Sequence, residues 1–254
     1  MKKILFTILL AFAFVSATIS AQQFFSPSGN SDEANTLYQK AIEAAFNAEH
    51  DKAVALFDKV MQKNPKCFMA MAHKALLAYH WEKKDDFNKN AAKALTMPAE
   101  SGFEKSVASL LKARLENRSE DASAIAKEMS ASNVNLAEAH LINSLIQFEE
   151  KDFAVALEAL YNVKRLAPDF APAYNMLGYA HMEQQQMEQA EKMFAKYMSL
   201  NPDSANPYDS MGDFLMAKGD YTKAAEMFEK AYSMNKDFKF SKEKAEEARK
   251  KADQ

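Results

Sequence analysis

Two consecutive stretches, APAYNMLGYAHMEQQQMEQAEKMFAKYMSLNPDS (residues 171–204) and ANPYDSMGDFLMAKGDYTKAAEMFEKAYSMNKDF (residues 205–238), follow one pattern in units of 34 residues. A glycine, an alanine and a phenylalanine recur in the same register in both units. They are Gly178, Ala190 and Phe194 in the first unit, and Gly212, Ala224 and Phe228 in the second. A fixed period of this length, with apolar residues every three or four positions, predicts stacked helical hairpins.

The same period extends toward the amino terminus with weaker agreement. Ala156 lies one period before Ala190, and Ala53 with Phe57 reproduces the alanine and phenylalanine of the pattern. Ala53 and Ala122 are 69 residues apart, which is two periods plus one residue. Two further units therefore fit between Phe68 and Leu136 with a net insertion of one residue. In the first of them, Ala91 reaches the place of the repeated alanine only after extra residues near 83–86, so a longer turn is expected there.

The residues that fill fixed positions of residues 171–204 resemble the tetratricopeptide repeat, a helix-turn-helix unit of the same length. They are Tyr174, Leu177, Gly178, Ala190, Phe194 and Pro202. The resemblance implies an all-α fold, a right-handed superhelical α-solenoid of about six such units with a C-terminal capping helix. The solenoid is expected over residues 32–238, in units 34–67, 68–102, 103–136, 137–170, 171–204 and 205–238, with the capping helix over residues 239–254.

Small residues are expected where the two helices of a unit approach most closely. Gly178 should face Ala190, and Gly212 should face Ala224, because a larger side chain at either glycine would overpack the hairpin. The phenylalanines Phe194 and Phe228 would then fill the space between neighbouring hairpins.

The amino terminus has the pattern of a bacterial secretory signal peptide over residues 1–21. Lys2 and Lys3 supply positive charge, an apolar run covers residues 4–15, and small residues precede the expected cleavage point. No cysteine lies near that point for lipid attachment. The mature protein is therefore expected in the periplasm or outside the cell, and residues 22–31, with a proline, a glycine and several serines, are expected to form a flexible leader.

Charge and hydropathy narrow the range of partners. The formal net charge is −3, and acidic and basic residues alternate along the chain without a basic stripe. A protein that binds the nucleic-acid backbone needs such a stripe, so nucleic acid is not an expected partner. After the leader, no stretch approaches the roughly 20 apolar residues of a transmembrane helix, and no integral membrane segment is expected in the mature chain.

Catalytic and metal-binding patterns are weak. The five histidines are scattered and form no known hydrolase or metalloprotease signature. Cys67, Met69, Met71 and His73 carry ligand types that suit copper(I). Alternate helical residues point to different faces, so only Cys67 with Met71, or Met69 with His73, could share one. Core packing and a buried thiol are the favoured interpretation. No catalytic residue, metal or cofactor is assigned, and an enzyme or metal carrier is the least favoured function.

The resemblance implies a binding groove along the first helix of each unit, at positions 5, 9 and 12. These positions hold Leu141, Leu145 and Phe148, then Asn175, Tyr179 and Met182, then Asp209, Asp213 and Met216. The groove is expected to bind an extended or helical segment of another protein, with apolar residues against the first trio and a basic residue near Asp209 or Asp213. Two alternatives stay open: adjacent repeats cover the apolar trio, or the solenoid associates with itself and binds no foreign segment.

Overall fold

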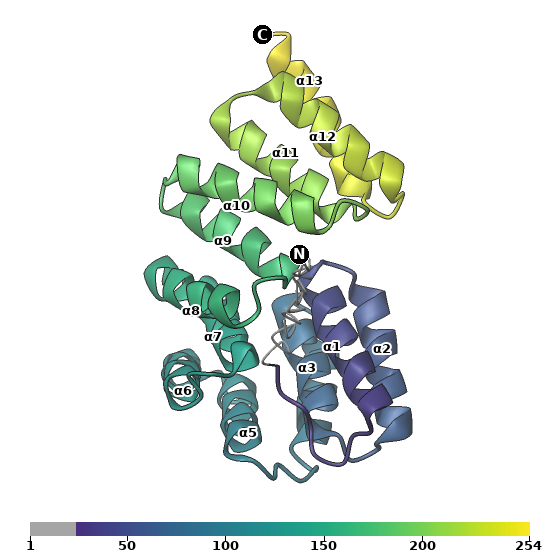
Figure 1. The fold of residues 1–254 in the computed structure, drawn as a ribbon, viewed down its shortest axis with the longest axis vertical. Helices are drawn as coiled ribbons and strands as arrows, with labels where there is room; N and C mark the ends of the chain where they lie inside the picture. Colours follow the sequence, from purple (N-terminus) through teal and green to yellow (C-terminus); the bar gives the residue numbers. More distant parts are fainter. Residues whose placement is uncertain (1–23) are drawn as a thin grey trace, which may run out of the picture.

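The computed structural model describes residues 24–254, a range that contains thirteen helices and no strand (Figure 1). The predicted signal peptide lies outside the described residues. The helices are α1 Asp32–Phe46, α2 His50–Lys63, α3 Phe68–His80, α4 Lys84–Ala94, α5 Gly102–Leu115, α6 Ser119–Ser132, α7 Ala137–Glu149, α8 Phe153–Leu166, α9 Ala171–Glu183, α10 Met187–Leu200, α11 Asn206–Lys218, α12 Tyr221–Met234 and α13 Lys239–Ala252. The prediction of an all-α helical repeat solenoid is confirmed.

Consecutive helices from α1 to α12 form hairpins with a shared turn geometry. One residue in each turn has a positive φ angle, as in the left-handed ending common at helix C-termini. These residues are Ala48, Glu82, Asn117, Lys151, Gln185 and Gly219. Their spacing is 34 residues everywhere except between Glu82 and Asn117, where it is 35.

The prediction of a longer turn near residues 83–86 is wrong. Glu82 takes the usual positive φ, and α4 starts two residues later, as in the other hairpins. The extra residue lies instead within the second half of this unit and its exit, where α4 is short and residues 95–101 connect it to α5. Phe87 and Ala91 lie one period after Ala53 and Phe57, so this unit has interchanged its small and aromatic residues. Both side chains are buried.

The two helical glycines accommodate phenylalanine rings rather than alanines. A Cβ atom added at Gly178 would lie 2.6 Å from the ring of Phe194, and one at Gly212 would lie 2.5 Å from the ring of Phe228. The expected pairing of Gly178 with Ala190 therefore named the wrong nearest neighbour. The glycine makes room for the aromatic ring four residues further along the second helix.

The chain curls so that its first hairpin meets the hairpins in its second half. The ring centroids of Phe46, at the end of α1, and Phe170 are 6.4 Å apart. The hydroxyl of Tyr197 in α10 donates to Asn47 Oδ1 at 2.8 Å and accepts from Asn206 Nδ2 at 2.8 Å. Figure 1 shows α9 and α10 between the amino-terminal helices and the end formed by α11 to α13.

Residues 24–31 are packed against this curl, so the expectation of a flexible leader does not hold for them. Phe24 is only 8% exposed, and its ring centroid is 5.0 Å from that of Phe170. Asn64 Nδ2 donates to the carbonyl of Ser28 at 3.1 Å. Two adjacent phenylalanines at the start of this segment give it apolar surface to bury, which its serines and glycine obscure in the sequence.

Candidate functional site

A cavity of about 610 Å³ lies where α1 and α3 face α7, α9 and α11. Its wall is largely aromatic because it collects one ring or more from several hairpins. These rings belong to Phe46, Trp81, Phe148, Phe153 and Tyr179. We call this space the aromatic cavity.

Four of the nine predicted groove residues line the aromatic cavity: Leu145, Phe148, Asn175 and Tyr179. They come from α7 and α9, whose first-helix positions face the inside of the curl. The ring of Phe148 meets that of Phe153 edge-on, with centroids 5.6 Å apart. The Tyr179 ring is held in the same way against Phe194, at 5.1 Å. The cavity wall is therefore fixed by packing.

Asn175 supplies a buried polar atom at the aromatic cavity. The residue is 9% exposed, and its Oδ1 has no hydrogen-bond partner within residues 24–254. An unpaired buried acceptor costs about 1 to 3 kcal/mol, and a ligand could recover that free energy only if the side chain turned Oδ1 toward the cavity. Lys151 and Glu183 place opposite charges at the edge of the same cavity.

Three other predicted groove residues do not line the aromatic cavity. Leu141 is fully buried in the main core and offers no surface to a partner. Met182 and Met216 are half-buried and pack against the core of the last hairpins. The alternative that adjacent repeats cover the apolar trio thus holds for Leu141, while Leu145 and Phe148 reach the cavity.

The acidic pair Asp209 and Asp213 is bound by the chain itself. Lys244 in α13 places its Nζ 3.0 Å from Asp209 Oδ2 and 2.8 Å from Asp213 Oδ1. Ser241 donates to Asp209 Oδ1 at 2.6 Å, and the Tyr179 hydroxyl donates to Asp213 Oδ2 at 2.9 Å. The capping helix therefore supplies the basic group that the sequence assigned to a partner.

Burial and the neighbouring charges shift the pKa values of this cluster. Burial raises the pKa of the Asp213 carboxyl above its ordinary value, even though Lys244 acts in the opposite direction. Burial alone would lower the pKa of Lys244, but its hydrogen bond to Asp213 and the charge of Asp209 outweigh burial and raise that pKa. Burial and the Asp213 charge also raise the pKa of Tyr179 well above its ordinary value.

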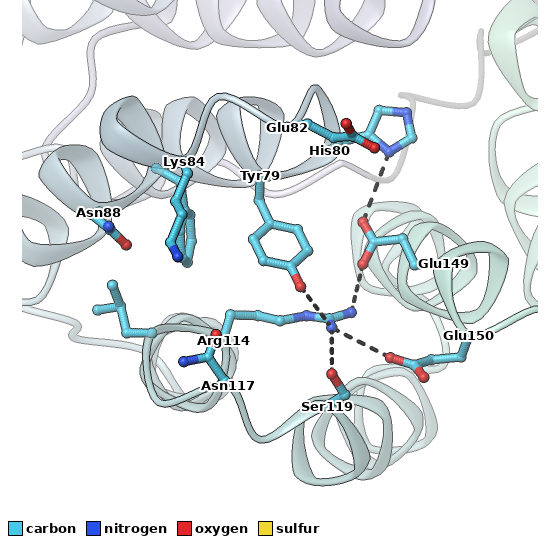
Figure 2. A pocket seen from close by; sticks show the side chains of 12 residues that line it. Tyr79, His80, Glu82, Lys84, Asn88, Arg114, Asn117, Ser119, Glu149 and Glu150 are labelled. Carbon is cyan, nitrogen blue, oxygen red and sulfur yellow. Dashed lines mark hydrogen bonds and ion pairs between the residues drawn. The ribbon is translucent and has the colours of Figure 1, made fainter.

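A second cavity, of about 790 Å³, lies at the carboxyl ends of α3, α5 and α7 and is mainly polar (Figure 2). Its centre is Arg114, which is 4% exposed and lies 4.8 Å from the ring centroid of Tyr79. Arg114 donates to Glu149 Oε2 at 2.6 Å and to Glu150 Oε1 at 3.3 Å. Figure 2 shows these groups converging from three hairpins, which makes Arg114 a joint between units.

The sequence did not point to the residues that α1 and α3 contribute to the aromatic cavity. Phe46, Trp81 and Leu77 reach it only because the chain curls. Trp81 carried one available signal, since it is the single tryptophan of the chain and lies at a hairpin turn. A large aromatic residue at a turn is worth testing as a binding residue even without a repeat pattern.

The soft-ligand run of α3 is packed in the core. Cys67 is 1% exposed, and burial raises the pKa of its thiol. His73 Nε2 donates to Glu138 Oε1 at 2.7 Å, so its ring is already engaged. Within residues 24–254, no three or more histidine, cysteine or acidic side chains are grouped so that they could hold a metal ion.

None of the helices in residues 24–254 has both the length and the apolar character needed to span a bilayer.

Comparison with known proteins agrees with this geometry. Two family models described as tetratricopeptide repeat match residues 147–211 and 205–238. No curated protein matches the chain in sequence. Similar solved structures include PilW, a type IV pilus biogenesis factor, at 19% identity and a TM-score of 0.53, with 84% of this chain and 98% of that chain covered. Another is TTC0263, a tetratricopeptide repeat protein of Thermus thermophilus, at 15% identity and a TM-score of 0.49, with 84% and 98% covered.

Residues 147–238 therefore consist of tetratricopeptide repeats, and the chain has the fold of a tetratricopeptide repeat protein. Proteins of this class are typically scaffolds for protein–protein interaction and do not catalyse reactions themselves. Their stacked repeats provide extended concave surfaces for partners. In this chain the curl has reduced such a surface to a cavity.

Proposed function

We propose that this protein is an interaction scaffold of the bacterial cell envelope, whose aromatic cavity receives an apolar side chain from an extended or helical segment of a partner protein. The observation that carries the proposal is the unpaired Oδ1 of Asn175 beside an aromatic wall. Cavities of roughly 300 to 1,000 Å³ are the usual size of ligand pockets, and this one is about 610 Å³.

The chemistry of the wall defines the partner segment. Phe148, Phe153 and Tyr179 favour an aromatic or large aliphatic side chain, because such anchors dominate the free energy of many interfaces. A rotation of the Asn175 side chain that turned Oδ1 into the cavity would let it accept a hydrogen bond from a backbone N–H beside that anchor.

The acidic pair Asp209 and Asp213 is not proposed to bind the partner. Asp209 and Asp213 hold Lys244, so a basic partner residue would have to compete with α13. The proposed contact is therefore confined to the aromatic cavity.

Site-specific photocrosslinking in the native host tests this contact. Benzoylphenylalanine at position 148 should form adducts with a defined partner, and Asn175→Leu in the same protein should abolish them. The matched control is benzoylphenylalanine at position 240, because Phe240 is 76% exposed on α13 and lies away from the cavity. Identical adducts at both positions, or adducts at position 148 that persist with Asn175→Leu, would contradict the proposal.

The proposed envelope location is supported by the pattern of residues 1–21 and has its own test. Protein purified from the native host should be recovered from the periplasm or the medium, with Gln22 as its first residue on amino-terminal sequencing. Recovery from the cytoplasm with Met1 retained would refute export without affecting the proposed cavity.

A further inference from the structure

Residues 24–31, which we call the strap, lie in a seat built by several helical hairpins. Phe25 places its ring centroid 5.1 Å from that of Phe103 in α5, and Phe24 packs on Phe170 before α9. Pro27 is also buried, whereas Ser26 and Ser28 are exposed. The strap is therefore held by its apolar side chains, much as a bound peptide would be.

Glu138 in α7 forms the polar centre of the seat. It is fully buried, and its Oε1 accepts from the Tyr38 hydroxyl at 2.6 Å and from His73 Nε2 at 2.7 Å. Its Oε2 accepts from the backbone N–H of Phe25 at 3.2 Å. Tyr38 and His73 belong to α1 and α3, so two of the three donors to Glu138 come from outside the strap.

An empty seat would leave a buried carboxylate oxygen short of a donor. Unsatisfied buried charged groups are strongly unfavourable, so the seat favours an occupant that brings a hydrogen-bond donor, as the strap does with the Phe25 N–H. That preference involves no side chain of the strap. Any extended segment could meet it if two adjacent aromatic residues filled the places beside Phe103 and Phe170.

The strap is connected to α1 in a way that permits exchange. Gly29 has a φ angle of 74°, and the N–H of Asn30 donates to the Pro27 carbonyl at 3.3 Å, which forms a turn between the strap and Ser31. Ser31 then caps α1 through the N–H of Ala34 at 3.2 Å. The helix therefore has its own start signal, and its cap does not depend on the strap being seated.

We propose that the seat is a peptide-binding site for an extended segment with two adjacent aromatic residues, occupied in cis by the strap. The strap of a second copy of this chain would fit the seat, because it has the same sequence as the strap that occupies the seat in cis. Exchange of straps would link copies without a new interface. The seat borders the aromatic cavity through Phe170 and Phe46, yet it binds through Glu138 and not through Asn175.

A binding assay in trans tests the proposal on the full chain. The probe is a fluorescein-labelled peptide of residues 24–33, acetylated at its amino terminus, followed by fluorescence anisotropy. With Phe24→Ala and Phe25→Ala combined, the seat should lose its cis occupant and bind the probe. The wild type should bind it at least about tenfold more weakly, since a tethered ligand has an effective concentration in the millimolar range.

A control probe and two further variants separate binding at the seat from non-specific binding. A probe with both phenylalanines replaced by alanine should not bind, and Ser28→Ala should behave as the wild type. Phe25→Pro empties the seat independently, because proline lacks the N–H that Glu138 accepts. Equal binding to wild type and variants, no binding to a folded variant, or unfolding of both variants by circular dichroism would each overturn the proposal.

Discussion

The carboxyl-terminal hairpins, α9 to α12, and the amino-terminal ones, α1 to α6, share their turn geometry but differ in what packs inside them. In the first group a glycine accommodates a phenylalanine ring, as Gly178 does for Phe194. In the second group the α3–α4 hairpin interchanges the small and aromatic residues at Phe87 and Ala91, whereas Ala53 and Phe57 in α2 keep the regular order. The family models match only residues 147–238, yet the positive-φ turn residues continue upstream to Ala48.

Buried polar groups distinguish the two regions further. Glu138 ties α1, α3 and the strap to α7, and Arg114 joins the ends of α3, α5 and α7. The last hairpins have no equally buried charge of this kind among the described residues, and their one large polar cluster, around Lys244, is half-exposed. The difference indicates that repeat packing stacks the second half, while specific polar contacts hold the irregular first half in its curl.

Removal of the Glu138 carboxylate, which holds the irregular first half together, should have the largest effect on stability. We expect Glu138→Ala to lower the free energy of unfolding by about 3 to 5 kcal/mol, because Tyr38, His73 and the Phe25 N–H lose one shared acceptor in a buried site. Urea denaturation followed by circular dichroism measures it. Glu138→Gln keeps an acceptor oxygen and should cost less; equal losses would mean that the carboxylate charge, and not hydrogen bonding, is essential.

Filling the glycine site should disturb the regular half by a smaller amount. Gly178→Ala is expected to cost about 1 to 3 kcal/mol, since the added Cβ would lie 2.6 Å from the buried Phe194 ring. Gly102→Ala is the matched control in α5, because nothing lies within 4 Å of a Cβ there. Denaturation midpoints should fall only for Gly178→Ala. A second change, Phe194→Leu, should restore part of the loss, and full additivity would argue against direct contact.

The turn residues should respond alike in both halves. Glu82→Gly and Gln185→Gly are each expected to raise stability by less than about 1 kcal/mol, because glycine adopts positive φ without strain but loses more chain entropy. Gly219→Ala should lower stability by about 1 kcal/mol for the same reason. Thermal melts of the three variants check this. Opposite signs for Glu82→Gly and Gln185→Gly would show that the two halves do not share one turn.

The smallest expected effect is spectroscopic and concerns His50, which stacks on Trp81 with ring centroids 3.6 Å apart. Burial and the neighbouring Lys83 lower the pKa of His50 from 6.5 to about 4, although Asp51 opposes them. The folded state therefore disfavours the protonated ring. The free energy of unfolding is highest above pH 6.5, where His50 is neutral in both states, and it decreases as the pH falls toward 4.

Trp81 reports this titration directly as the single tryptophan. Its emission should change with a midpoint near pH 4, and His50→Gln should remove the change while circular dichroism confirms that the fold persists. A midpoint near 6.5 would indicate that His50 is solvated and not stacked on Trp81.

The fold was predictable because its determinants are local. Helical period, prolines and the 34-residue register of residues such as Ala190 and Phe194 identify each hairpin without knowledge of the rest. The residues that α7 and α9 contribute to the aromatic cavity were predictable for the same reason, since Phe148 and Tyr179 occupy fixed positions in the repeat. The repeat register identifies the inward face of a single helix. It does not predict which residues lie across the cavity from that face.

What lies opposite depends on contacts between distant residues. Trp81 and Phe46 join the cavity through a curl fixed by pairs such as Asn47 and Tyr197, which are 150 residues apart. Lys244 reaches Asp209 because α13 stacks as one more helix, a contact that the charge pattern of the capping helix does not reveal. Glu138, the single acidic residue between Ala137 and Phe148, was the one local sign of a buried polar centre.

The most direct test of the account is a double-mutant cycle between Asn47→Ala and Tyr197→Phe, because the curl is what turns a concave surface into a cavity. Urea denaturation of the wild type, both single variants and the double variant gives the coupling free energy. We predict a coupling of about 1 kcal/mol, as for residues joined by a buried hydrogen bond. Strict additivity would mean that the first hairpin does not meet α10 in solution, and the aromatic cavity would not exist.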